Sequence, residues 1–264
     1  MIVDIHAHAF PDALAPRAME VLSGNSGLQP STDGTCSGLQ DSMKLAGVDV
    51  SVIVPIATKP SQVRGINAWA AEVNQENRDL ICFGTLHPDQ DDWQPEIEQM
   101  VADGIKGVKV HPDYQLFYVD EPRLFPIYRA IARAGLMLLF HAGVDIGLAP
   151  PVHCTPDRLA KALDEAPNLV TIAAHMGGYK CWDDVQRYLI GRDLYFDTSY
   201  SLADLGAESM VSLIRAHGID RILFGTDAPW TEQAAEADGI RALDLTDNEI
   251  EAVLGGNAKR LLGI

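Results

Sequence analysis

Short apolar runs alternate along the chain with longer segments in which apolar residues recur at helical spacing. The short runs are rich in β-branched residues and predict eight strands, at residues 2–8, 50–57, 81–87, 107–111, 136–141, 169–175, 194–198 and 221–227. The longer segments predict helices at residues 61–78, 92–103, 122–134, 156–166, 182–190 and 206–217. Regular alternation of strand and helix predicts a parallel sheet, because parallel neighbours need a crossover connection.

Eight strand–helix units favour closure of that sheet into one α/β domain, a single (β/α)₈ TIM barrel over residues 1–264. The length of 264 residues agrees with this fold, which typically takes about 250 residues. An open doubly wound sheet is the alternative. Its nucleotide-binding forms lack support, because no GxGxxG or GxxxxGK[ST] motif follows a strand.

Residues 11–40 interrupt the alternation and precede a short helix expected near 41–47. Their second half is rich in Gly, Ser, Thr and Pro, which is typical of irregular structure. A long irregular segment is either a functional lid or a mobile insertion. Because it follows the first strand, we expect a lid-like insertion over the C-terminal mouth of the barrel. After residue 231 we expect final helices, including 246–254 and 257–262.

Polar residues end most of the predicted strands. Six of the eight histidines occupy such positions, where active sites of TIM barrels are built. The residues at these strand ends are His6, His8, His87, Lys109, His111, His141, His175 and Asp227. We expect the remaining histidines to matter less: His153 lies in a loop near the mouth, and His217 ends a helix, where it favours the dipole. Asp4 is expected to be a buried hydrogen-bonding group.

His6 and His8 are two residues apart on one strand, so both side chains point to the same face. Two inward imidazoles would be costly without a partner, and a divalent cation that binds both is the simplest one. Asp227 can add a carboxylate ligand and accept a proton from water. His141 completes a set of nitrogen and oxygen donors that suits zinc, with manganese or iron also possible. His175 is either a further ligand or a general base beside the metal.

The motifs DIHAH at 4–8, GVKVHP at 107–112, FHAG at 140–143, AHMGG at 174–178 and FGTDAP at 224–229 resemble the amidohydrolase superfamily. The resemblance is to its amidohydrolase-related branch, which includes carboxymuconate-semialdehyde decarboxylase, resorcylate-type decarboxylases, lactonases and other hydrolases. It implies that His6, His8, His141 and Asp227 bind one divalent metal, and that His175 is the catalytic histidine.

The fourth strand leaves an alternative open. Some members of the superfamily carry a carboxylated lysine there that bridges two metals, and Lys109 shares a face with His111. The GVKVHP form is more similar to the mononuclear branch, which implies that Lys109 and His111 contact substrate. TatD-like nucleases also begin with HxH, but they would carry a glutamate on the fourth strand, and none is present.

The main expectation is a hydrolase that cleaves an amide, lactone or ester bond of a small molecule with metal-activated water. Asp227 and His175 would hold that water and move its proton. The alternative is a non-oxidative carboxy-lyase acting on a small aromatic or enolic carboxylic acid, since the same ligands serve both chemistries. The chain is shorter than expected for the decarboxylases of this branch, which favours the hydrolase. A metal-binding barrel without activity is the third possibility.

The net charge is −17, with 37 acidic and 20 basic residues. Such a surface disfavours nucleic acid and anionic membranes as partners. No apolar run approaches the roughly 20 residues of a membrane span, and the N-terminal residues lack the pattern of a signal peptide, so we expect a cytoplasmic protein. The four cysteines show no CxxC spacing, which argues against a thiolate zinc site or a disulfide framework. A homodimer is a common expectation for such barrels.

Overall fold

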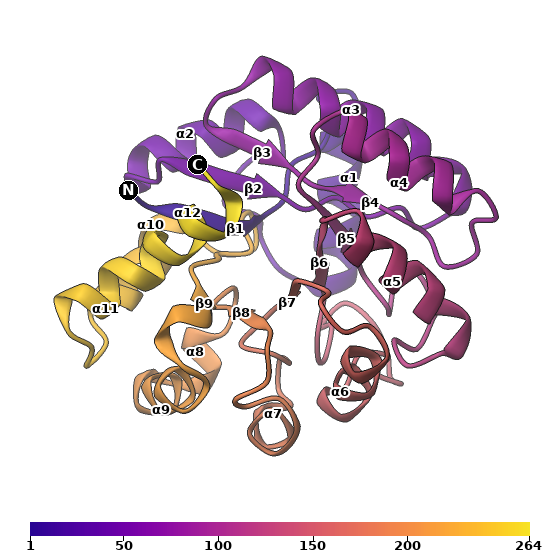
Figure 1. Cartoon of the computed structure of the whole chain (residues 1–264). Helices are drawn as coiled ribbons and strands as arrows, with labels where there is room; N and C mark the ends of the chain where they lie inside the picture. The colour runs from indigo at the N-terminus through magenta and orange to yellow at the C-terminus, as the bar shows by residue number, and fades with distance from the viewer.

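A ring of parallel strands forms the centre of the molecule, with helices around it (Figure 1). The computed structural model describes residues 1–264. The strands are β1 Val3–Ala7, β2 Val50–Ile53, β3 Leu80–Cys82, β4 Gly84–Thr85, β5 Gly107–Val110, β6 Met137–Phe140, β7 Thr171–Ala173, β8 Tyr195–Asp197 and β9 Ile222–Leu223. They pair in the orders β1-β2-β3 and β4-β5-β6-β7-β8-β9, and every pairing is parallel.

Two junctions join these sets of strands into a barrel. β3 and β4 correspond to the one strand predicted at 81–87, and between them the Phe83 N–H donates to the Ile53 carbonyl at 2.9 Å. On the other side, the Ile5 N–H donates to the Phe224 carbonyl at 2.8 Å, and Ala7 pairs with Ala228. The predicted TIM barrel is therefore confirmed.

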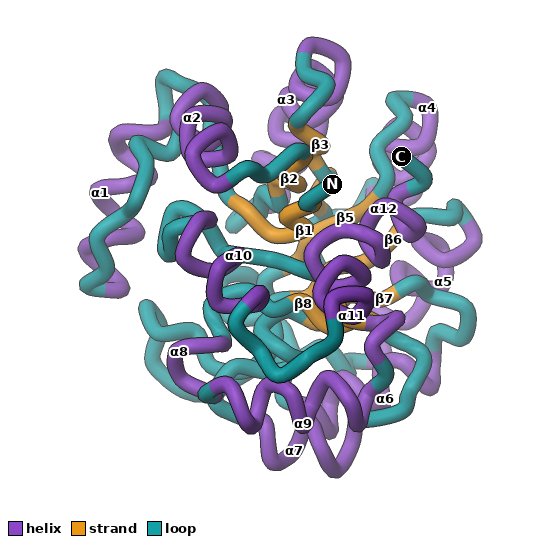
Figure 2. The backbone as a smooth tube through the Cα atoms, turned by 90° about the vertical axis from the view of Figure 1, so that its left-hand side faces the viewer, coloured by secondary structure: helices purple, strands orange, loops and turns teal.

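The helices surround the strands, which lie at the centre of the view in Figure 2. The predicted helices between strands correspond to α3 Val63–Glu76, α4 Trp93–Ala102, α5 Phe125–Arg133, α6 Pro156–Glu165, α7 Trp182–Tyr188 and α9 Ala207–His217. The others are α1 Ala15–Ser26, α2 Cys36–Ala46, α8 Leu202–Leu205, α10 Gln233–Arg241, α11 Asp247–Glu251 and α12 Asn257–Leu262. None of them combines the length and apolar character that a membrane crossing requires.

The segment expected to be irregular, residues 11–40, is largely helical, so that part of the prediction was wrong. α1 has a proline in its first turn and ends at Gly27, whose φ of 73° is left-handed. Its apolar residues do not form one stripe, because Met19 is buried in the core while Val21, 47% exposed, lines a cavity. A helix with apolar residues on two sides lacks the single periodic face that the sequence analysis looked for.

The apolar core has two parts. A cluster of 53 buried residues lies between the strands and the outer helices. A second cluster of 13, which includes Val52, Leu139 and Ile172, fills the inside of the barrel. It also contains Ala258 and Leu262 from α12, which contacts β1 and β9. The barrel is therefore filled by side chains, and the polar residues that end the strands lie at the opposite end from α12.

Candidate active site

His6, His8 and Asp227 lie together where β1 meets the segment after β9. The Asp227 N–H donates to the His6 carbonyl at 2.7 Å, and the His8 N–H donates to the Ala228 carbonyl at 2.6 Å. The Asp227 Oδ1 atom is 2.9 Å from His8 Nε2 and 3.4 Å from His6 Nε2. Donor atoms of all three residues fall within 4.8 Å of one another. The structure therefore brings three of the four predicted ligands together.

A carboxylate that the sequence analysis missed orients His6. Asp197, the last residue of β8, is fully buried, and its Oδ2 atom accepts a hydrogen bond from His6 Nδ1 at 2.9 Å. Burial, reinforced by nearby Lys109, lowers the pKa of His6 to about 4, although Asp197 opposes this. His6 is therefore neutral, with its proton on Nδ1 and its lone pair on Nε2, facing Asp227. A carboxylate that orients a histidine in this way is common behind metal ligands.

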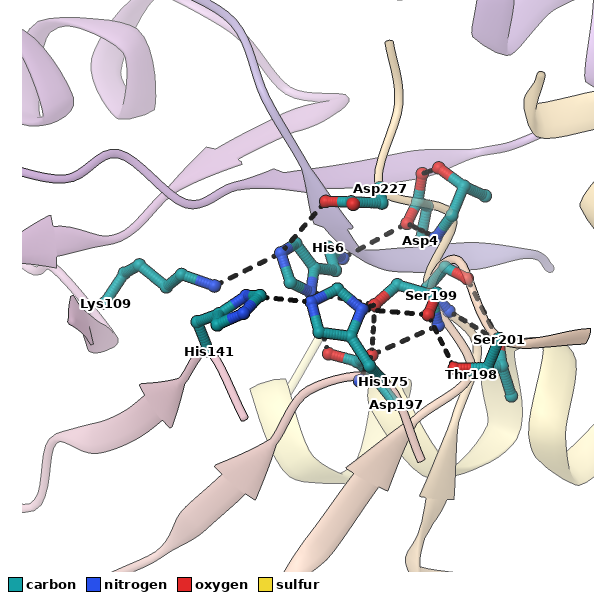
Figure 3. A network of polar contacts seen from close by, with 12 residues as sticks. Asp4, His6, Lys109, His141, His175, Asp197, Thr198, Ser199, Ser201 and Asp227 are labelled. Carbon is teal, nitrogen blue, oxygen red and sulfur yellow. Dashed lines mark hydrogen bonds and ion pairs between the residues drawn. The ribbon is translucent and has the colours of Figure 1, made fainter. Parts of the chain in front are cut away.

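A chain of hydrogen bonds also fixes the protons of His175 and His141 (Figure 3). His175 Nδ1 lies 3.0 Å from the Ser199 carbonyl, which can only accept, so His175 carries its proton on Nδ1. His175 Nε2 then accepts from His141 Nδ1 at 3.1 Å. This leaves a lone pair on His141 Nε2, which is buried and has no hydrogen-bond partner. Burial and the neighbours His111 and His175 lower the pKa of His141 well below its usual value.

His141 also belongs to a second group of donors. Atoms of His111, His141 and Asp145 lie within 4.8 Å of one another. The rings of His111 and His141 stack with centroids 4.0 Å apart, and His111 Nε2 is 3.1 Å from Asp145 Oδ2. The structure thus divides the predicted ligands between two neighbouring groups, and the complete four-residue set stays a prediction. Asp145 was not among the residues expected to act.

These residues fit a divalent metal. Imidazole nitrogens and an ionised carboxylate are the donors that zinc, manganese or iron take. Burial alone would raise the pKa of Asp227, but the hydrogen bond from His8 and the nearby His6 outweigh it and lower the pKa. The strongest indication of a metal is the Nε2 atom of His141, which is buried and has no hydrogen-bond partner. An unsatisfied buried acceptor is costly, and a bound metal would satisfy it.

Two residues of this site have unusual backbone angles. His175 has a φ of 59° and Asp227 a φ of 68°, both in the left-handed region. Residues other than glycine rarely adopt this conformation, and aspartate tolerates it better than most. Such strain is often found at functional positions.

Lys109 lies where the sequence placed it, inside the barrel and next to His6. Its side chain is 1% exposed, and Nζ donates to His6 Nε2 at 3.2 Å. Burial lowers the pKa of Lys109 to about 8, although Asp197 and Asp227 oppose this. The side chain therefore remains mostly an ammonium at neutral pH, yet it forms no ion pair with a carboxylate.

The other residues singled out from the sequence lie outside the group of candidate metal ligands. His217 Nε2 lies 2.9 Å from the Leu194 carbonyl, and its ring stacks on Phe196, as expected for a structural residue. His87 and His153 are outside the cavity described below. Asp4 is buried and accepts from Thr226, from Gln233 and from the His6 N–H, as predicted for a hydrogen-bonding group.

A cavity of about 1070 Å³ opens at this end of the barrel. Its floor contains every candidate residue of the site: His6, His8, Lys109, His111, His141, His175 and Asp227. An apolar wall is formed by Leu14 just before α1, Val21 and Leu22 of α1, Trp69 and Trp230. The site therefore combines a polar floor with walls that suit an apolar small molecule.

Comparison with known proteins decides the family. A family model of amidohydrolases matches residues 3–264, which is almost the whole chain. The chain belongs to the amidohydrolase family. This confirms the resemblance seen in the strand-end motifs, and amidohydrolases of this family are metal-dependent. No curated protein matches the chain.

Solved structures share the fold of this amidohydrolase over its full length. An uncharacterized TIM-barrel protein from Bordetella bronchiseptica is 19% identical, with a TM-score of 0.77 and coverage of 99% of this chain and 98% of that one. A 2,6-dihydroxybenzoate decarboxylase from Rhizobium is 19% identical, with a TM-score of 0.74 and coverage of 99% and 98%. A 5-carboxyvanillate decarboxylase from Novosphingobium aromaticivorans, complexed with manganese and a nitrobenzoic acid, is 16% identical, with a TM-score of 0.74 and coverage of 100% and 96%.

Proposed function

We propose that this amidohydrolase is a metal-dependent carboxy-lyase that removes CO₂ from a small aromatic or enolic carboxylic acid. The observation that carries the proposal is the buried side chain of Lys109 on the cavity floor, which contacts His6 and forms no ion pair with a carboxylate. A buried cation is stable only when paired, and a substrate carboxylate would complete the pair. Two of the structural neighbours reported above are decarboxylases of aromatic acids, which supports this choice over hydrolysis.

The proposed centre holds one divalent cation on His6, His8, His141 and Asp227. The nitrogen and oxygen donors predicted from the sequence favour zinc. The Novosphingobium neighbour holds manganese, which makes manganese the second candidate. When bound, the cation would act as a Lewis acid that orients substrate oxygens and spreads negative charge.

The protein's own residues would bind and orient the acid. Lys109 would hold the carboxylate while Trp69 and the α1 wall contact the ring. When the C–C bond breaks, its electron pair stays on the ring carbon and CO₂ leaves as a neutral molecule. Asp227, whose side chain is 14% exposed, would carry a proton from solvent to that carbon. Apolar walls favour this step, because the charged carboxylate is replaced by neutral CO₂.

Hydrolysis of an amide, lactone or ester is the second candidate. It is favoured by the position of Asp227 against His8 and by neighbouring His175, which lines the same cavity. Together these groups could hold a water molecule and take its proton. The cavity floor would then activate water and not bind a carboxylate.

The test is an assay of metal-reconstituted protein against hydroxybenzoates, enolic acids, lactones, amides and esters. CO₂ release that is lost in Lys109→Met and in His6→Ala/His8→Ala supports the carboxy-lyase. The control is His153→Gln, which lies outside the cavity and should keep the activity. Hydrolysis without CO₂ release would reject the carboxy-lyase in favour of the second candidate, and no reaction by fully loaded protein would leave an inactive metal-binding barrel.

A further inference from the structure

The charges along the cavity do not balance. Besides the buried Lys109, four residues with charged side chains line it, the two exposed cations Arg17 and Lys59 and the two carboxylates Asp145 and Asp227. Each carboxylate already pairs with histidine, Asp145 with His111 and Asp227 with His8. Neither Arg17 nor Lys59 forms an ion pair with these carboxylates, although the chain as a whole has a net charge of −17.

Arg17 and Lys59 come from two separate elements near the cavity mouth. Arg17 lies on α1, and Lys59 immediately precedes the turn of 3₁₀-helix at Pro60–Gln62. Both are exposed and neither forms an ion pair, and they are the two exposed cations that line the cavity. Two unpaired cations that line the same cavity form an attractive site for an anion.

The space between the cavity floor and these two cations is large and apolar. Cavities for drug-sized ligands measure about 300–1,000 Å³, and this one, at about 1070 Å³, exceeds what a single-ring acid would fill. Leu14, just before α1, and Val21 of α1 line it although they are 57% and 47% exposed, which leaves apolar surface for a ligand to cover. The lining therefore runs from the buried ammonium of Lys109, past apolar side chains, to the exposed cations.

We infer that the substrate is an elongated diacid, with an apolar body between the reacting carboxylate on the floor and a second anionic group at the mouth. Arg17 and Lys59 recognise the second group and so determine specificity. The inference rests on the proposed function for the reacting carboxylate only. Recognition of the remote group is a binding property that does not depend on whether CO₂ is released.

The test compares two ligands of matched length by isothermal titration calorimetry with the metal-reconstituted protein. The ligands are para-pentylbenzoate, with one carboxylate, and para-(carboxybutyl)benzoate, with two. We expect the wild-type protein to bind the diacid about tenfold more tightly than the monoacid at low salt, and the preference to shrink as salt is added. In Arg17→Gln/Lys59→Gln the diacid should bind no better than the monoacid, whose affinity should not change.

The matched control is Arg78→Gln/Lys259→Gln, which removes two exposed cations outside the cavity. It should keep the wild-type preference for the diacid. Equal or absent binding of the two ligands by the wild-type protein would overturn the inference, and so would a preference that survives in Arg17→Gln/Lys59→Gln. Preference for the diacid without any CO₂ release would reject the proposed function alone.

Discussion

The ionised carboxylate of Glu236, on α10, destabilises the folded protein. Its Oε2 atom is buried and has no hydrogen-bond partner. Burial, followed by the negative charges of Asp4 and Asp227, raises the pKa of Glu236 from 4.5 to about 7. The folded state therefore binds this proton more tightly than the unfolded chain does.

The sign and size of the effect follow from this difference. Between pH 4.5 and about 7 the folded state holds more protons than the unfolded state, so stability falls as pH rises through that window. At about 1.4 kcal/mol for each pH unit, ionised Glu236 costs about 3 kcal/mol above the window. Glu236→Gln removes the charge and keeps the shape of the side chain. We expect the variant to match the wild type at low pH and to be more stable at high pH.

Urea unfolding of both proteins at about pH 5 and about pH 8.5 measures this. The variant should gain about 3 kcal/mol over the wild type between the two pH values. Glu98→Gln, an exposed glutamate in the interior of α4, is the matched control and should gain almost nothing. If the difference between Glu236→Gln and the wild type is the same at both pH values, the reasoning from the unpartnered carboxylate is refuted.

Further variants test the site itself. Asp197→Asn replaces the carboxylate that accepts the Nδ1 proton of His6 with a neutral amide and should weaken metal binding about 10- to 100-fold, as measured by competition with a chelator; unchanged affinity would remove Asp197 from that role. His175→Ala should keep the metal, measured by plasma mass spectrometry, and lose most turnover, whereas equal loss of metal would make His175 a ligand. Lys109→Met should raise KM for carboxylate substrates at least tenfold, since a charge-assisted pair is worth about 1.5–3 kcal/mol, and an unchanged KM would argue against carboxylate binding. Metal removal should lower the unfolding temperature, and readdition should raise it again, with the logarithm of metal concentration once that exceeds Kd.

The barrel and the position of its site were predictable because both depend on periodicity. Strand–helix alternation determines parallel pairing, and parallel strands bring their C-terminal residues to one end. His6 and His8 could therefore be placed beside Asp227, more than 200 residues away, from strand ends alone.

Other features depend on contacts that no local pattern shows. Asp197 ends β8 and, like the predicted site residues, lies at a strand end. Its local sequence, Phe196-Asp197-Thr198, does not reveal that its side chain contacts His6. The strand predicted at 81–87 is divided at Phe83, and on either side of the break side chains of α3 bind its backbone, Asn74 at Cys82 and Asn67 at Thr85. α1 was missed because half of its apolar surface faces a cavity and not the core.

The left-handed backbone at Asp227 reverses the usual ranking of conservative substitutions. Asp227→Glu preserves the charge, but it adds a methylene to a residue whose φ is 68°, a conformation that glutamate adopts less readily than aspartate or asparagine. Asp227→Asn preserves the backbone and abolishes the charge. In a saturation library at this position, the variants that fold best and the variants that retain chemistry should therefore be different sets, and ranking by expression level would select against activity.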